Sequence, residues 1–324
     1  MKCLSCDTEN QDDEIFCIAC GDQLKELESS SLPTEVCDEK LLEEIKELEI
    51  PKVPILVRIA GWTDKGNVRE TNQDNYKIAT WLFPDNKTRL DLLIVADGMG
   101  GGEHGAEFAY IGVNKISEFI SNFVNSSSIS ELNEIGAIMQ PAVQAANAEV
   151  LKFRLENNIS GRNEGTTLVV VVILSDLTTG KIICHGWNEG DSRLYLFNSS
   201  ELKQISKDHT LAGGLNRFLG KHRTIGGDEI DLEFWAGEYP EITFLLCTDG
   251  FSDMLSLAQI QEYLATNPHP AIAVEELIEK AKSIEKPCEP DAKPGDDNLT
   301  VVLWQAKPVL VEKKEETKNE SGNE

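Results

Sequence analysis

The fold is decided around residues 95–105, where the sequence is VADGMGGGEHG. The apolar run Leu92–Ala96 predicts a buried strand, and Asp97 stands at its end. Most of the residues that follow this carboxylate have no side chain, because glycine occupies positions 98, 100, 101, 102 and 105. One Asp-Gly pair after a strand is most often an ordinary turn. This stretch therefore indicates a functional site only if similar stretches occur elsewhere in the sequence.

Two further segments combine an aspartate with an expected chain reversal. The stretch LLCTDGFSD, residues 245–253, is a second apolar run that ends in Asp-Gly, here at Asp249. Asp297 stands in GDDN, residues 295–298, directly before another apolar run. We therefore expect Asp97, Asp249 and Asp297 to meet at one edge of a sheet sandwich.

Such a cluster of like charges in a poorly solvated site either takes up protons or binds cations. Mg²⁺ and Mn²⁺ prefer carboxylate, carbonyl and water oxygens, and the carbonyl of Gly98 is a further candidate ligand. Two such ions close together can stabilise an in-line displacement at phosphorus. Arg69, within TDKGNVRETNQD at 63–74, is suited to clamp a phosphate with its forked guanidinium.

Strands and helices are expected in groups rather than in alternation. The predicted strands are 55–62, 74–82, 89–96, 166–174, 182–189, 193–197, 202–205, 230–235, 242–247 and 299–304. The predicted helices are 104–123, 129–156, 257–265 and 271–283. Runs of strands separated by paired helices favour an α+β layered fold of mostly antiparallel sheets.

The 324-residue chain carries a formal net charge of −26 and 40% hydrophobic residues. This charge argues against non-specific binding to nucleic acid or to an anionic membrane surface, because both need basic patches. The first residues, MKCLSCDTEN, lack the apolar run of a signal peptide, and no window reaches the roughly 18 apolar residues of a transmembrane helix. We therefore expect a cytoplasmic protein, with reduced core thiols at Cys184 and Cys247.

Four of the eight cysteines lie within the first twenty residues. They form two C-x-x-C pairs whose spacing matches a tetrahedral site for one structural Zn²⁺ ion, with the ligands Cys3, Cys6, Cys17 and Cys20. The unit is too small for a hydrophobic core, so metal binding would supply its folding energy. A redox dithiol pair is the alternative, but the thioredoxin-like pattern that it needs is not visible.

The composition divides the chain into four segments. We expect a zinc ribbon at 1–24, an acidic linker at 25–54, a globular domain at 55–306 and a disordered tail at 307–324.

Seven motifs occur along the chain in a characteristic order: TDKGNVRETNQD, VADGMGG, GTT at 165–167, GDSR at 190–193, DHT at 208–210, LLCTDGFSD and DDNLTVV. By these motifs the chain, from about Ile59 to Gln305, resembles the metal-dependent Ser/Thr protein phosphatases of type 2C (PPM), in their bacterial form. The resemblance implies that 55–306 is a four-layer α-β-β-α sandwich of two antiparallel sheets flanked by helices. It also implies hydrolysis of phosphoserine and phosphothreonine on proteins.

The resemblance further implies a binuclear Mn²⁺ or Mg²⁺ centre. Carried over by motif, the metal ligands are Asp97, Asp249, Asp297 and the carbonyl of Gly98. Asp74 would hold metal-bound water, and Arg69 would bind the substrate phosphate. The attacking group would be metal-bridging water or hydroxide, with no phosphoenzyme. GTT and GDSR are expected to be mainly structural, and His104 and His209 are not expected to be catalytic.

Two departures from the family pattern affect the expected site. The bacterial enzymes usually carry a mobile flap after DHT, whereas here only residues 211–215 separate Thr210 from NRFLG at 216–220, which predicts a more open substrate groove. A third metal in the family depends on an aspartate just before GTT, where this chain has GRNE at 161–164. Glu164 or Asn163 would have to substitute as ligand, and Arg162 could not.

Two other functional classes remain in view. The first is a catalytically weak phosphopeptide-binding or sensor protein that uses the same pocket, although the retained aspartates and Arg69 favour an enzyme. The second is a zinc-ribbon nucleic-acid binder, which the acidic charge disfavours. The expected partners are phosphorylated protein substrates, with a cognate Ser/Thr kinase left open, and neither nucleic acid nor a membrane.

Overall fold

The computed structural model describes residues 52–99, 104–161, 163–211, 214–266, 268–284 and 294–309. These residues belong to the second of the two units into which the chain divides, Ile50–Glu324. The predicted zinc ribbon, most of the predicted linker and most of the predicted tail lie outside the described residues, so those predictions stay open.

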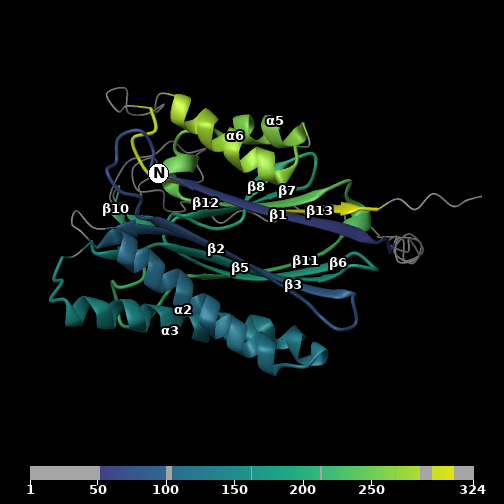
Figure 1. Ribbon diagram of the computed structural model, residues 1–324, viewed down its shortest axis with the longest axis horizontal. Helices are drawn as coiled ribbons and strands as arrows, with labels where there is room; N and C mark the ends of the chain where they lie inside the picture. Colours follow the sequence, from purple (N-terminus) through teal and green to yellow (C-terminus); the bar gives the residue numbers. More distant parts are fainter. Residues whose placement is uncertain are drawn as a thin grey trace, which may run out of the picture. The chain divides into compact units, whose positions relative to one another are not determined.

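Two antiparallel sheets form the centre of this unit (Figure 1). One sheet has the order β1 (Ile55–Asp64), β13 (Leu299–Pro308), β12 (Ile242–Cys247), β7 (Arg193–Phe197) and β8 (Leu202–Gln204). The other has the order β11 (Asp228–Trp235), β6 (Lys181–Glu189), β5 (Leu168–Asp176), β3 (Thr88–Met99) and β2 (Asp74–Leu82). The short β4 (Gly165–Thr166) pairs with the end of β3, and β9 (Thr210–Leu211) and β10 (Gly214–Leu215) form a separate hairpin.

Helices cover the outer faces of both sheets (Figure 1). The long helices α2 (Gly105–Ser126) and α3 (Ile135–Glu156) cover the sheet that contains β3, and the 3₁₀ helix η1 (Ile129–Glu134) connects them. Helices α5 (Leu257–Ala265) and α6 (Pro270–Ser283) cover the other sheet, after the short α4 (Asp249–Ser252). A short 3₁₀ turn, η2 (Ala236–Glu238), precedes β12. The expected fold of antiparallel sheets flanked by helices is confirmed.

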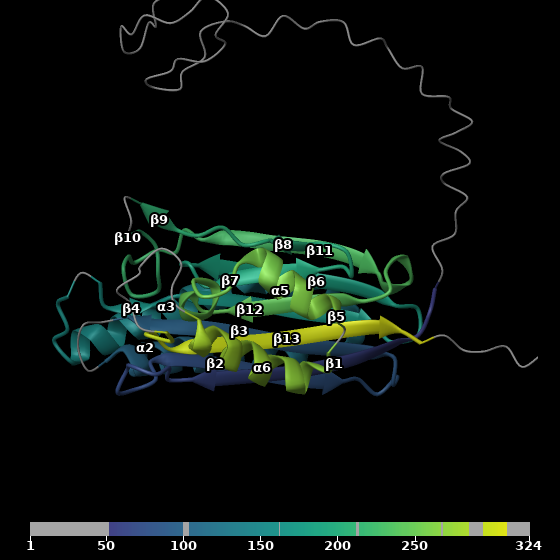
Figure 2. The same ribbon diagram turned by 90° about the horizontal axis from the view of Figure 1, so that it is seen from above.

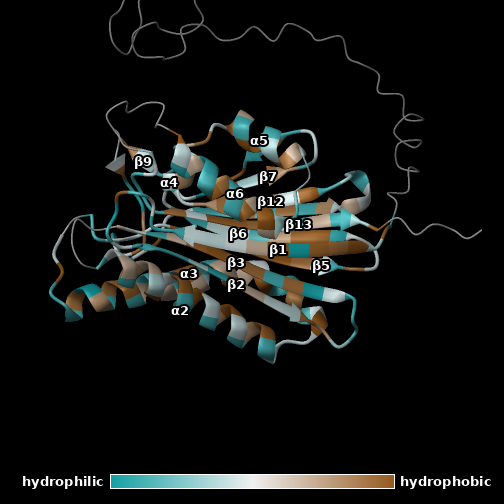
Figure 3. Cartoon of the chain, turned by 45° about the horizontal axis from the view of Figure 1, so that its top comes forward, coloured by the Kyte–Doolittle hydropathy of each residue, from teal (hydrophilic) through white to brown (hydrophobic). Residues whose placement is uncertain are grey.

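Strand β3 shows why the layers hold together. Its side chains alternate between two cores, as the period of two in a strand requires. Leu92 and Ile94 pack against α2 and α3, whereas Leu93 and Val95 pack between the two sheets. A third core lies between the sheet of β13 and helices α5 and α6. Figure 3 shows the result as largely hydrophobic strands inside and helices with one polar face outside.

The alternation also fixes the direction of Asp97. This residue lies on the same face of β3 as Leu93 and Val95, so its carboxylate points between the two sheets, at the end of the strand. It is therefore the strand period that aims this carboxylate into the interior of the sandwich.

Three predicted boundaries are wrong in an informative way. Strand β3 runs through Asp97 and Gly98 to Met99, because this end pairs with β4, so the expected chain reversal at Asp97 does not occur. The first turns of the predicted helix 129–156 form η1, which begins at a capping box of Ser128 and Glu131. Strand β13 continues to Pro308 beside β1, two residues into the predicted tail.

The described helices include none that is both long enough and apolar enough to cross a membrane.

Candidate active site

Four aspartates meet at one end of the sandwich, each supplied by a different element. Asp74 is the first residue of β2 and lies directly opposite Asp97 of β3. Asp249 is the first residue of α4, immediately after β12, and Asp297 lies just before β13. Asp74 approaches the others closely enough to interact with Asp249 and Asp297. The structure thus brings together residues that lie up to about 220 positions apart in sequence.

A pocket of about 290 Å³ opens at this point. It is lined by Arg69, Gln73, Asp97, Gly98, Met99, Asp191, Leu215, Asp249, Asp297 and Asn298. Two other cavities, of about 250 and 440 Å³, lie along η1, α3 and the sheet of β6. Their volume is comparable, but neither is lined by several aspartates that converge from different elements, so charge rather than size distinguishes the site.

The pocket carboxylates repel one another in a poorly solvated place. Burial, and then the charges of Asp249 and Asp74, raise the pKa of Asp97 well above its usual range. Burial, followed by the charge of Asp297, raises the pKa of Asp249 to about 6. Burial raises the pKa of Asp74 to about 7, although two hydroxyl groups oppose that shift. The fold holds these groups together at a cost that a bound cation would offset.

Asp74 is fixed through one of its two carboxylate oxygens. Its Oδ2 accepts hydrogen bonds from the Thr248 hydroxyl, at 2.8 Å, and from the Thr300 hydroxyl, at 2.7 Å. Its Oδ1 is buried and has no hydrogen-bond partner, and the same is true of Oδ1 of Asp249. Buried carboxylate oxygens without a partner are uncommon, so these two atoms point to a missing donor or cation.

The backbone around Asp97 is held by the motif GTT. The Asp97 N–H donates to the Thr167 hydroxyl at 2.9 Å, and the Asp97 carbonyl accepts from the Thr166 hydroxyl at 2.9 Å. The Thr167 hydroxyl also bonds the Ser192 hydroxyl of GDSR at 2.7 Å. These contacts agree with the expectation that the threonines and this serine are structural.

Only glycine fits at position 98. A Cβ atom there would lie 1.9 Å from the Gly105 carbonyl oxygen and 2.6 Å from that of Gln73, and both of these are backbone atoms that cannot move aside cheaply. The glycine therefore lets strand β3 pass against the start of α2 and the loop before β2. The need for glycine at this position is a packing requirement, independent of any ligand.

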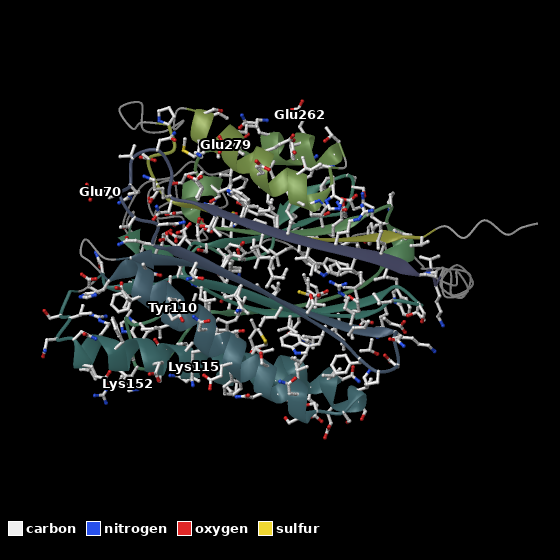
Figure 4. All side chains as sticks on the ribbon, viewed as in Figure 1. Glu70, Tyr110, Lys115, Lys152, Glu262 and Glu279 are labelled. Carbon is white, nitrogen blue, oxygen red and sulfur yellow. The ribbon has the colours of Figure 1, made fainter. Side chains whose placement is uncertain are left out.

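Arg69 reaches the pocket from the loop between β1 and β2. Its Nη2 forms an ion pair with Oδ2 of Asp297 at 2.9 Å, and its side chain remains about half exposed. Asn298 fixes this loop, because its side chain accepts from the Gln73 N–H and donates to the carbonyls of Lys65 and Thr71. Figure 4 labels the neighbouring Glu70, which marks the position of the loop at this end of the molecule. The backbone is thus pinned, while the guanidinium lies at the surface.

The donor set fits hard divalent cations. It consists of carboxylate oxygens, with two buried oxygen atoms that lack partners. Within the described ranges, no three His, Cys, Asp or Glu side chains are yet arranged to hold one ion. Asp297, one of the carboxylates, already binds the Arg69 guanidinium through Oδ2. An ion would have to compete with Arg69 for this carboxylate.

Comparisons with known proteins agree with this geometry. The family model for protein phosphatase 2C matches residues 67–281. The chain belongs to the protein phosphatase 2C family. A serine/threonine phosphatase, Stp of Listeria innocua, is 26% identical over 261 residues, which cover 74% of this chain and 92% of the relative. The protein phosphatase PhpP of Streptococcus pneumoniae is 25% identical over 269 residues, covering 76% of this chain and 96% of the relative.

A solved structure extends the comparison to three dimensions. The catalytic domain of the serine/threonine protein phosphatase PstP, in complex with two manganese ions, is 26% identical, with a TM-score of 0.59. The match covers 78% of this chain and 99% of that domain. Together with the named relatives, this makes the present chain a protein serine/threonine phosphatase.

Within this 2C fold, one pocket carboxylate was not predicted. Asp191, in GDSR, lines the pocket, and burial followed by the charge of Asp249 raises its pKa to about 7. The expectation that GDSR is mainly structural holds for Ser192 and for Arg193, whose guanidinium binds Asp208 of DHT. One signal in the sequence pointed to Asp191: it follows Gly190 and the predicted strand 182–189, much as Asp97 and Asp249 follow apolar runs.

The proposed substitute for a third-metal ligand lies elsewhere. The side chain of Glu164 packs against Gly161 and does not line the pocket, and Asn163 is exposed. Arg162 and the cysteines of the predicted zinc ribbon (Cys3, Cys6, Cys17 and Cys20) lie outside the described residues. A role for Glu164 in holding a third metal therefore stays a prediction, and this structure brings no support for it.

The two histidines make contacts of a structural kind. His209 accepts a hydrogen bond from the Gly190 N–H at 3.0 Å, and His104 packs edge-on against Phe153. The hairpin β9–β10 stands where the resemblance implies a long flap, and its last residue, Leu215, lines the pocket. The short connection is thus part of the pocket wall.

Proposed function

We propose that this phosphatase hydrolyses phosphoserine and phosphothreonine on proteins with the help of two Mn²⁺ or Mg²⁺ ions held in the aspartate pocket. Asp97, Asp249 and Asp297 would hold the ions, together with the carbonyl of Gly98. Such ions supply activation of the attacking water and neutralise charge at phosphorus. The observation that carries the proposal is the pair of buried, unpartnered Oδ1 atoms of Asp74 and Asp249 among carboxylates with raised pKa values.

Asp97 and Asp74 have different proposed roles in the pocket. Asp97 faces both Asp249 and Asp297, so it is the carboxylate best placed to serve both ions. Asp74 is held at Oδ2 by two threonines and keeps Oδ1 available, which suits a residue that orients water in the pocket.

Arg69 is the residue that we assign to the substrate phosphate. Its guanidinium already binds an anionic oxygen of Asp297, and its loop is fixed by Asn298. A phosphate that entered the pocket would offer it a second, bidentate partner. Arg69 would then move from Asp297 to the phosphate, which would free Asp297 for an ion.

An activity assay with metal removed and restored tests this proposal. The full chain should hydrolyse p-nitrophenyl phosphate and a phosphothreonine peptide with Mn²⁺, and a chelator should abolish both activities. Asp249→Asn should lose most of the activity, whereas Asp85→Asn, in the turn before β3 and remote from the pocket, should stay within about twofold. If folded, Mn²⁺-loaded protein turned over neither substrate, the phosphopeptide-binding alternative would take its place.

The N-terminal cysteines support a second, separate proposal. We infer from the spacing of Cys3, Cys6, Cys17 and Cys20 that residues 1–24 bind one structural zinc ion. Metal analysis of the full chain should find about one zinc per chain, lost on substitution of Cys3 and Cys6 by serine. Zinc content unchanged by that substitution would rule the site out.

A further inference from the structure

A cationic segment follows the hairpin that borders the pocket. Residues 216–225, NRFLGKHRTI, contain Arg217, Lys221, His222 and Arg223 and no acidic residue. The chain as a whole has 56 acidic against 30 basic residues, so such a run is unusual for it. Its position beside the pocket suggests a role in handling an anionic partner.

Hydrogen bonds place this segment next to the catalytic strand. Leu219 and Thr166 exchange two backbone hydrogen bonds, of 2.9 and 3.1 Å, and Thr166 of β4 in turn pairs with Gly98 of β3. Two such neighbour spacings put the backbone of Leu219, in the middle of the segment, about 10 Å from Gly98. Lys221 donates from Nζ to the carbonyl of Leu215, which lines the pocket. Figure 2 shows β4 and the hairpin β9–β10 at the same end of the molecule.

The backbone of the segment is held firmly on helix α3. The Gly220 N–H donates to Oδ1 of Asn147 at 2.8 Å, and the Asn147 amide donates to the His222 carbonyl at 2.9 Å. Gln144 donates in the same way to the carbonyl of Arg223. The cations are thus presented from a fixed support, which reduces the entropy lost when they bind a partner.

The guanidinium groups themselves are available. Arg217 and Arg223 are exposed, and neither forms an ion pair within the part of the chain that the structure describes. Arg217 packs over Gly226, and Lys221 lies 5.0 Å from the Phe218 ring centre. By contrast, Arg69, Arg89 and Arg193 each bind an aspartate.

We propose that Arg217 and Arg223, supported by Lys221, bind acidic side chains that flank the phosphorylated residue of the protein substrate. The inference rests on the proposed function, because it takes the aspartate pocket as the place of the phosphate. A pocket of about 290 Å³ accepts the phosphorylated side chain, so the flanking residues must lie on the surrounding surface. An extended peptide advances about 3.3 Å per residue, so a residue about three positions from the phosphorylated one spans the distance to Leu219, and residues three to six positions away are the ones that the cationic segment can contact.

The charge of the chain strengthens the need for such a contact. The two proposed ions would neutralise the aspartates of the pocket itself, but the chain as a whole has a formal net charge of −26, so acidic residues of a substrate are repelled by the surface around the pocket. The cationic segment offsets this repulsion on one flank of the pocket. The selected substrates would be phosphoproteins whose sites are rich in aspartate and glutamate.

Steady-state kinetics on two matched phosphothreonine peptides test the proposal. One peptide carries aspartates at positions three to six on both sides of the phosphothreonine, and the other carries asparagines there. The full-length wild type should prefer the acidic peptide in kcat/KM, and Arg217→Gln with Arg223→Gln should lower that preference about tenfold, as expected for two partly exposed charge contacts. Lys87→Gln, an exposed cation at the far end of β3, should leave the preference unchanged.

The remaining outcomes are equally informative. The preference should fall as ionic strength rises, because exposed charge contacts are screened. Equal kcat/KM for the two peptides in the wild type, with normal turnover of p-nitrophenyl phosphate, would overturn the inference and leave the proposed function intact. A folded, Mn²⁺-loaded wild type that does not turn over p-nitrophenyl phosphate would instead overturn the proposed function. Increased turnover of every substrate in the double variant would overturn the inference by indicating that an acidic segment of this chain occupies the surface.

Discussion

Strand β3 carries two aspartates, six residues apart and on the same face, and the fold treats them in opposite ways. Asp91 is fully buried, and four hydrogen bonds from Thr80, Arg89 and Trp304 reach its two oxygens. Asp97 instead faces Asp74, Asp249 and Asp297. The chain thus neutralises one carboxylate with its own donors and leaves the other among like charges.

The difference separates a structural carboxylate from a functional one. A buried charge that the fold has fully paired contributes to specificity of packing, and nothing else is needed to keep it in place. A buried charge among other carboxylates is maintained against its own electrostatic cost, which points to a ligand that offsets that cost. The four predictions that follow test this contrast.

The largest expected effect is on catalysis. Asp97→Asn should lower kcat/KM for p-nitrophenyl phosphate by at least about 100-fold, because it removes a proposed ligand of both ions. Asp91→Asn should leave kcat/KM, per folded molecule, within about twofold of the wild type. Comparable losses in both variants would mean that the two aspartates do not differ in function.

The free energy of unfolding should respond in the reverse order, with the larger loss in Asp91→Asn and none in Asp97→Asn. Asp91→Asn leaves the Arg89 and Trp304 donors without their anionic partner and should lower the free energy of unfolding by about 3 kcal/mol. Asp97→Asn, in chelator, should raise it by about 1 kcal/mol, because it relieves repulsion. Urea unfolding of both variants measures this, and a destabilised Asp97→Asn protein would contradict it.

The third prediction concerns pH in metal-free protein. Burial raises the pKa of Asp249 to about 6 and that of Asp74 to about 7, from 3.8. Between pH 5 and pH 8 the native state therefore binds more protons than the unfolded state, so stability falls as pH rises, by about 4 kcal/mol. Mn²⁺ should remove most of this slope, and Asp249→Asn should reduce it. A chelated wild type whose stability is flat or rises over this interval would be inconsistent with repulsion in the pocket.

The smallest effect should come from the hydroxyl groups that support Asp74. Thr248→Val and Thr300→Val each remove one hydrogen bond to Oδ2 and should lower kcat about threefold to tenfold. Thr80→Val, which removes the matching hydroxyl from Asp91, serves as the control and should leave kcat unchanged. An equal loss of kcat in the control would assign the effect to packing.

Local patterns predicted most of this fold. Strand β2, strand β12 and helix α5 begin and end where their apolar periodicity does, because their burial follows directly from their own sequence. The end of β3 could not be predicted in this way, because it depends on pairing with β4, about seventy residues later. The 3₁₀ start of η1 likewise depends on a capping box that competes with continuous helix.

The site shows the same division. Asp97, Asp249 and Asp297 could be proposed because each stands beside an apolar run, and the structure brings them to one pocket. Asp191 was missed, because its position after a strand and Gly190 is also typical of an ordinary turn, and its proximity to Asp249 is visible only in three dimensions. The ion pair between Arg69 and Asp297 also joins segments more than two hundred residues apart, which no local pattern reveals.

Direct counting of bound Mn²⁺ tests the central claim most sharply. Equilibrium binding to the full chain, followed by the loss of the free Mn²⁺ resonance signal, should give about two ions per wild-type molecule. Asp91→Asn should bind the same number, and Asp97→Asn should bind at least tenfold more weakly. Wild-type stoichiometry and affinity in Asp97→Asn would contradict the account, because the unpaired carboxylates of the pocket would then have no part in holding metal.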